Sequence, residues 1–392
     1  MDIFSVNRRF WVKRTTFLTG TAVIVAVGVS LYRDTESARV GAVPADAMMA
    51  AWVFQGNASC AGSGCHGESE ATEQSGQMIG DESNIWSESD PHTNAYASLK
   101  DDLSNEIAGK LKIADATASA RCLDCHAINA PEDKRGELFS LSDAVGCESC
   151  HGPAEKWLDP HAEEGWTAEQ RQAHGHAGLW KQFGLNDTAN LALRAETCVA
   201  CHLQMDKDMI DAGHPPLEFE MYAYNYYISK DPDAEFAIHW DEPIGEMRDA
   251  QLWAVGQAAA LGAAKAQAVD WKKKGWDLDA AEALVKLYQD GVGIASKHFG
   301  GDTAEALAKA TYKPESCAGA AKALAALAGG AADPIQRRVI ASGVAALGSA
   351  IFDGREEEAP EEFWDTFYTA IDPETGADDY AAAVKALAEM IE

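Results

Sequence analysis

Small and apolar residues recur with helical spacing through the C-terminal part of the chain. Seven alanine-rich segments after Trp240 show this period: 246–270, 278–298, 302–311, 315–328, 334–352, 360–370 and 376–391. Glycine pairs at 300–301 and 329–330 and the Asp333–Pro334 pair separate several of them. The pattern predicts a helical bundle over residues 244–392, in which Cys317 is a buried core residue rather than a reactive thiol.

At the start of the chain, basic residues precede a stretch without charge. Arg8, Arg9, Lys13 and Arg14 come before residues 15–32, which hold no charged side chain. Basic residues stay on the cytoplasmic side of a bacterial inner membrane, so the remainder is expected on the periplasmic side. We favour an uncleaved membrane anchor over residues 1–32 and a linker over 33–55. Cleavage near residues 42–47, which would release a soluble periplasmic protein, is the alternative.

Between these regions the pattern is irregular. From Asn57 to about His239, glycine, proline and polar residues interrupt short helical stretches, and eight of the nine cysteines lie here. The sequence therefore predicts a mainly α protein, with a loop-rich domain over residues 56–243 followed by the bundle.

The eight cysteines form four motifs that each end in histidine. We number them along the chain: the first is Cys60, Cys65 and His66; the second is Cys122, Cys125 and His126; the third is Cys147, Cys150 and His151; the fourth is Cys198, Cys201 and His202. The last three have the form CxxCH, and the first is the longer CAGSGCH.

This spacing is typical of covalent haem attachment. Two thiols add to the vinyl groups of haem, and the next histidine ligates the iron. A zinc half-site or a redox dithiol would explain one CxxCH but not three that each end in histidine. In the first motif, Gly62 and Gly64 supply the backbone freedom that the longer loop needs, and a Cys60–Cys65 disulfide is the alternative. We expect four covalently attached haem c groups, whose macrocycles supply much of the apolar core.

The charge of the chain limits its partners. The chain has 32 basic and 62 acidic residues, a formal net charge of −30. Such a chain repels nucleic acid, and it favours basic protein partners or serves solubility alone. One acidic cluster contains Glu356, Glu357, Glu358, Glu361 and Glu362.

Seven further histidines are candidates for the second axial position on the irons: His92, His161, His174, His176, His214, His239 and His298. His92 follows Pro91 in a short segment that is expected to be helical. His161 lies too close along the chain to the third motif to reach the same iron, so it is expected to serve a neighbouring one.

From about Ser59 to Met205 the sequence resembles the tetrahaem cytochrome c-554 family. The resemblance rests on the order of the four motifs, on the sequences AVGCESCHGP and CVACHL, and on the spacing of Trp86, His92, Ala95 and Leu99. It implies an electron-transfer protein. It also implies distal ligands: His161 for the iron at His66, and His92 for the iron at His151. The iron at His126 is five-coordinate in that family, although His174, His176 or His239 could fill the position here. The iron at His202 takes a downstream histidine, for which we favour His214 over His239 and His298.

The expected function is electron transfer between redox proteins, such as basic cytochromes or a quinol-oxidising membrane complex, at the inner membrane. Two alternatives remain: an electron-transfer subunit of a larger redox complex, and an oxidoreductase that acts on a small nitrogen compound at an open haem.

Overall fold

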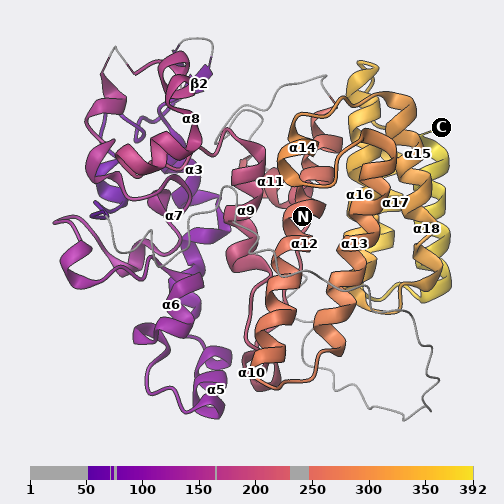
Figure 1. Cartoon of the computed structure of the whole chain (residues 1–392), viewed down its shortest axis with the longest axis horizontal. Coiled ribbons are helices and arrows are strands. Elements are labelled where there is room, and N and C mark those ends of the chain that lie inside the picture. The colour runs from indigo at the N-terminus through magenta and orange to yellow at the C-terminus, as the bar shows by residue number, and fades with distance from the viewer. Residues whose placement is uncertain (1–51, 71, 75–76, 164–165, 230–246, 392) are drawn as a thin grey trace. The chain divides into compact units, whose positions relative to one another are not determined.

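The computed structural model describes residues 52–391 except 71, 75–76, 164–165 and 230–246 (Figure 1). The expected anchor, almost all of the linker and His239 lie outside these residues. So does the expected domain boundary at 243–244, which stays a prediction. Within the part of the chain that is described, no helix has the length and apolar character needed to cross a membrane.

The structure is mainly α, as expected. Residues 52–229 form short helices joined by turns, with one small antiparallel hairpin of β1 (Thr72–Gln74) and β2 (Gln77–Ile79). The α-helices of this part are α3 (Glu82–Glu88), α4 (Ala95–Ser98), α5 (Asp102–Leu111), α6 (Ala120–His126), α7 (Cys147–His151), α8 (Ala168–Phe183), α9 (Leu191–His202), α10 (Lys207–Ala212) and α11 (Met221–Ser229). Single 3-10 turns lie between them: η1 (Asn57–Ser59), η2 (Pro91–Asn94), η3 (Ala116–Ala118), η4 (Glu132–Lys134), η5 (Leu141–Asp143), η6 (Ala154–Lys156) and η7 (Pro160–Ala162).

The C-terminal part is a bundle of longer helices that agree with the seven expected segments. They are α12 (Arg248–Lys273), α13 (Asp279–Phe299), α14 (Ala304–Ala308), α15 (Pro314–Ala325), α16 (Pro334–Gly354), α17 (Glu361–Ile371) and α18 (Ala377–Met390), with a 3-10 turn η8 (Ala328–Gly330). α16 begins as the sequence predicts, because the Asp333 side chain caps its first turn and Pro334 occupies the first helical position.

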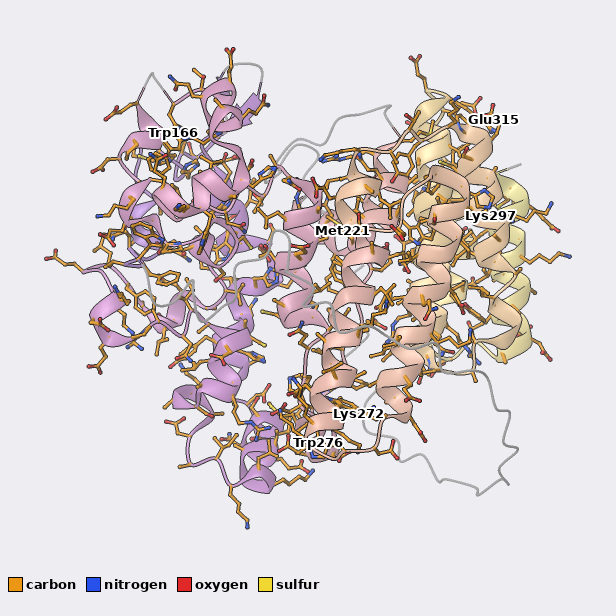
Figure 2. All side chains as sticks on the ribbon, in the orientation of Figure 1. Trp166, Met221, Lys272, Trp276, Lys297 and Glu315 are labelled. Carbon is orange, nitrogen blue, oxygen red and sulfur yellow. The ribbon has the colours of Figure 1, made fainter. Side chains whose placement is uncertain are left out.

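Small residues let the bundle helices approach closely. Gly256 of α12 lies against Met221 of α11, and a Cβ atom at Gly256 would be only 2.5 Å from the Met221 Cβ. Met221 is labelled in Figure 2. Cys317 is fully buried among the bundle helices, as expected.

The apolar core extends beyond the bundle. One cluster contains the bundle core together with Leu191, Ala195, Val199 and Leu203 of α9, so the helix of the fourth motif belongs to the same core as α12. By contrast, the described part of residues 52–190 holds two small clusters of buried side chains, one around Leu99 and Leu123 and one around Phe54, and buried residues such as Trp157 and Leu179 belong to neither. Side chains alone supply little core there.

Candidate haem-binding site

The motifs differ in local structure. The second, third and fourth motifs each end a helix, so that His126, His151 and His202 are the last residues of α6, α7 and α9. The first motif is a turn after η1. Its two thiols are free, with Cys60 buried and Cys65 exposed, so the alternative of a Cys60–Cys65 disulfide does not occur in this structure.

Three motif histidines each lie beside a second histidine from elsewhere in the chain. The ring centroids are 6.1 Å apart for His66 and His161, 5.9 Å for His92 and His202, and 6.2 Å for His126 and His214. A metal–imidazole bond is about 2 Å long, and the ring centroid lies roughly 1 Å behind its nitrogen, so two imidazoles on one metal have centroids about 6 Å apart. All three pairs have this spacing.

Hydrogen bonds at Nδ1 orient five of these six rings. His66 Nδ1 lies 2.8 Å from Glu82 Oε2 and His92 Nδ1 lies 2.9 Å from Asp90 Oδ1. The Nδ1 atoms of His126, His161 and His214 lie within hydrogen-bonding distance of backbone carbonyl oxygens. A bond of this kind holds the proton on Nδ1 and leaves Nε2 available for a metal.

Burial keeps two of the rings neutral, which is the form that ligates iron. It lowers the pKa of His202 to about 3, with His92 contributing. It also lowers the pKa of His214. At His66, the bond to Glu82 raises the pKa, as expected when a carboxylate increases the basicity of a ligand ring.

The structure changes two of the expected pairings. His161 lies beside His66, as the resemblance implies. His92, expected at His151, lies beside His202 instead. The Trp86 side chain, which bonds to the Val145 carbonyl, fixes α3 and the following turn η2 next to the segment that precedes the third motif.

His214, expected at His202, lies beside His126. The reason is that α10 is fastened to the second motif. Arg121, which directly precedes Cys122, forms ion pairs with Asp206 and Asp208.

The remaining described candidates have other neighbours. His174 packs edge-on against Phe183, and the exposed His176 contacts Asp187 and Asn190. His298 packs against Gly319 within the bundle. Among the described residues, no group of three or more His, Cys, Asp or Glu side chains is placed to hold a bare metal ion.

The first and third motifs are joined through buried polar groups. Glu148, between the cysteines of the third motif, accepts backbone hydrogen bonds from Gln55, Gly56 and Ala154. Asn57 accepts a bond from the Cys147 backbone N–H at 2.9 Å. The Cys60 and Cys147 thiols lie within hydrogen-bonding reach, an interaction that lowers the pKa of Cys60 and raises that of Cys147.

The third and fourth motifs are joined by Asn186, whose side chain donates to the Cys150 carbonyl at 2.6 Å and to Thr197 of α9 at 3.1 Å. The fourth and second motifs meet at their thiols. Contact with Cys201 lowers the pKa of Cys125, and Cys201 Sγ lies 3.9 Å from the Asp124 carbonyl oxygen. The motifs therefore form a continuous series in the order first, third, fourth, second.

Sequence reasoning missed Glu148, Asn57 and Asn186. Glu148 was visible inside the distinctive GCESCHGP sequence. Nothing in the sequence marked the two asparagines, because their roles depend on segments distant along the chain.

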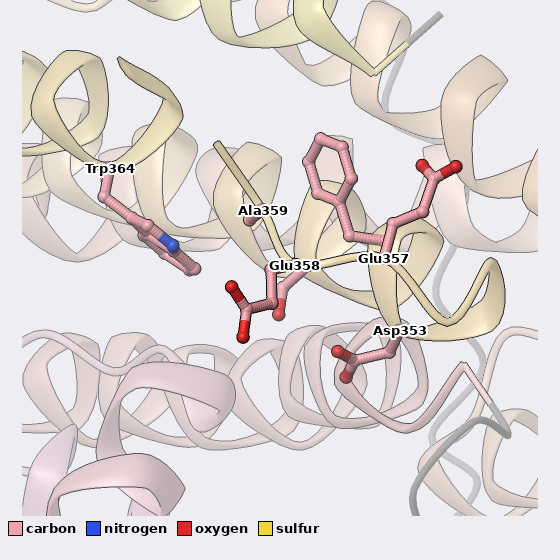
Figure 3. A pocket seen from close by; sticks show the side chains of 7 residues that line it. Asp353, Glu357, Glu358, Ala359 and Trp364 are labelled. Carbon is pink, nitrogen blue, oxygen red and sulfur yellow. The ribbon is translucent and has the colours of Figure 1, made fainter. Parts of the chain in front are cut away.

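A separate pocket lies between α16 and α17 (Figure 3). It has a volume of about 400 Å³, and the Asp353, Glu357 and Glu358 carboxylates and the Trp364 ring line it. No motif residue contributes to it, so it is no part of the haem-binding site.

Part of the chain is similar in sequence to known cytochromes. Residues 59–152 match the family described as cytochrome c554 and c-prime. The matched region is similar to cytochromes of this family. A relative, cytochrome c-554 from Nitrosomonas europaea, is 27% identical over 205 residues, which cover 50% of this chain and 73% of the relative. No solved structure matches the chain.

The residues fit the covalently bound haem c that this family implies. The cysteines would hold the group, and the paired histidines have the spacing and the Nδ1 anchoring of axial ligands. The two small apolar clusters of residues 52–190 leave an apolar group to complete the core. This part of the chain is therefore similar to c-type cytochromes.

Proposed function

We propose that this protein carries four haem c groups and transfers electrons between redox proteins on the periplasmic side of the inner membrane. Residues 15–32 tether it there, or cleavage near residues 42–47 releases it. Its partners are redox proteins: a quinol-oxidising membrane complex as donor and a basic cytochrome as acceptor.

The continuous series of motifs is the observation that supports this proposal most strongly. Cys60 contacts Cys147, Asn186 bridges the third and fourth motifs, and Cys201 contacts Cys125. Haem c, when bound, supplies a one-electron iron couple. Contact between the four attachment sites would bring the haems close together, as the transfer of electrons from one haem to the next requires. A protein with a single reaction site would not need four attachment sites in contact.

The paired histidines point the same way. Two imidazoles without a methionine ligand favour a low reduction potential, since methionine ligation raises it. Glu82, which is hydrogen-bonded to His66, increases the basicity of that ligand further.

Intact mass and a reductive titration test the proposal together. We expect the polypeptide plus four haem groups, and four electrons taken up per chain. Three haems would show that CAGSGCH is not an attachment site, and Cys65→Ser would then leave the haem number unchanged. Rapid multiple turnover of hydroxylamine, nitrite or nitric oxide by the reduced protein would overturn the assignment as a carrier.

A further inference from the structure

We propose that His214 is the distal ligand of the iron held at Cys122, Cys125 and His126, so that the second motif is a six-coordinate site. The resemblance implies an open position there. The inference rests on the proposed function, because it requires haem at the second motif.

The His126–His214 pair has nearly the same centroid spacing as the other two pairs, and its interplanar angle of 75° matches the 74° of His92 and His202, whereas the rings of His66 and His161 are stacked at 11°. Its 6.2 Å centroid separation lies within 0.3 Å of the 5.9 Å and 6.1 Å of the others. His126 Nδ1 lies 2.8 Å from the Ala95 carbonyl oxygen, and His214 Nδ1 lies 2.8 Å from the Pro215 carbonyl oxygen. Both rings therefore keep Nε2 free for the iron.

The turn after α10 fixes the backbone position of His214. α10 ends at Gly213, whose φ of 115° is in a region that side chains with a Cβ atom rarely adopt. The His214 backbone N–H then bonds to the Met209 carbonyl at 3.0 Å. A short helix followed by a glycine turn thus fixes the direction in which the chain leaves α10.

Three contacts hold α10 and the turn that follows it: one comes from α5, and two come from the residue directly before the second motif. Lys110 of α5 donates to the Ala212 carbonyl at 2.9 Å. Arg121 Nη2 lies 3.0 Å from Asp206 Oδ2 and 2.6 Å from Asp208 Oδ1. These partly exposed ion pairs add little stability, but two of them on one arginine set the register of α10 against α6.

Six-coordination has a functional consequence. A histidine already on the distal side keeps small nitrogen compounds and other exogenous ligands away from this iron. An oxidoreductase acting at the second motif needs an open position on the iron, and His214 would occupy that position. The proposed function then becomes more specific, because this site transfers electrons without binding a substrate.

Replacing the histidine tests the inference by spectroscopy. We expect His214→Ala to retain all four haems by intact mass and to convert one low-spin iron to high spin in the electron paramagnetic resonance spectrum. His161→Ala is the positive control, and exposed His176→Ala, which removes a histidine of the same region, should leave the spectrum unchanged. A His214→Ala spectrum identical to that of the wild type would overturn the inference.

A second variant identifies which iron is affected. In a chain with Cys122→Ala and Cys125→Ala, which lacks this haem, adding His214→Ala should change nothing. A new high-spin signal there would assign His214 to another motif and overturn the inference. If that chain fails to mature, a crystal structure of the wild-type holoprotein decides, because His214 Nε2 must lie on the iron tethered by Cys122 and Cys125. The proposed function is tested separately. It stands if His214→Ala retains four haems and still exchanges electrons, whether or not its spectrum changes.

Discussion

Glu148 illustrates how single residues organise the motifs. It is completely buried, and burial raises the pKa of its carboxyl group. Three backbone N–H groups from two separate segments point at its oxygens, which offsets the cost of burying the carboxylate. A residue between two haem cysteines therefore also holds the chain around Gly56 against the third motif.

Glu148→Gln should weaken this joint. An amide keeps one oxygen but places an NH₂ group toward one of the three N–H donors, which loses its partner. Leaving a buried N–H unpaired costs about 1–3 kcal/mol, so we expect the free energy of unfolding to fall by that amount. Urea unfolding followed by haem absorbance measures it, with exposed Glu132→Gln as the control. Equal stability of the two variants would contradict the role assigned to Glu148.

At the scale of elements, the sequence predicted the bundle better than the motif region. α12 to α18 follow from local period and turn residues, because each helix buries one face against its neighbours. The distal histidines do not follow from such rules. His92 and His202 are 110 positions apart along the chain, yet their rings lie side by side. The resemblance implied His161 at His66, which the structure places there. The structure places His92 beside His202 and His214 beside His126, which are other motif histidines than the resemblance implied, and the ligation of both stays a prediction.

The contact between α9 and α12 is an element-scale feature that the sequence did not reveal. Met205, three residues after the fourth motif, donates its backbone N–H to Gln267 Oε1 at 2.8 Å and accepts a bond from Trp271 Nε1 at 2.8 Å. Both partners are buried residues of α12. The bundle thus fixes the end of the fourth motif.

Gln267→Ala should therefore loosen this connection. The Met205 N–H would lose its acceptor at a partly buried position, and we expect a loss of about 0.5–1.5 kcal/mol in the free energy of unfolding. Far-ultraviolet circular dichroism in urea provides the measurement. Gln204→Ala, an exposed glutamine next to Met205, is the matched control and should be close to neutral. An effect no larger than that of the control would mean that α12 does not hold the fourth motif through this bond.

α11 begins with a buried acid that should make stability depend on pH. Burial, with a contribution from Asp249, raises the pKa of Glu220 from 4.5 to about 7. The folded state then holds this proton more tightly than the unfolded state, so stability is highest at low pH and falls as pH rises from 4.5 through about 7. At about 1.4 kcal/mol per pKa unit, the loss is on the order of 3 kcal/mol.

Glu220→Gln should remove this dependence. The amide cannot ionise, and its oxygen still accepts a bond at the start of α11. We expect the variant to be more stable than the wild type at pH 8 and similar to it at pH 5, as measured by urea unfolding at both values. Exposed Glu282→Gln provides the reference. A pH profile with the wild-type slope would show that Glu220 does not titrate in this range.

At the scale of the whole molecule, charge is the dominant property. The formal net charge of −30 is spread over a chain whose acidic cluster at Glu356, Glu357, Glu358, Glu361 and Glu362 is exposed. A field of this sign attracts basic proteins over distances longer than a hydrogen bond and repels anions. Electron exchange should therefore respond to salt in opposite ways for cationic and anionic partners.

Stopped-flow kinetics of the reduced protein with a basic cytochrome should show exchange slowing as salt rises. The Debye length shrinks from about 10 Å at 0.1 M to about 3 Å at 1 M, so the attraction that steers the two proteins together is screened. A decrease on the order of tenfold is expected, since steering raises association rates by about 10- to 1,000-fold. Ferricyanide, an anion repelled by the same surface, is the internal control, and its reduction should accelerate with salt. If both oxidants respond with the same sign, or neither responds, the surface does not steer the reaction, and the acidic residues serve solubility alone.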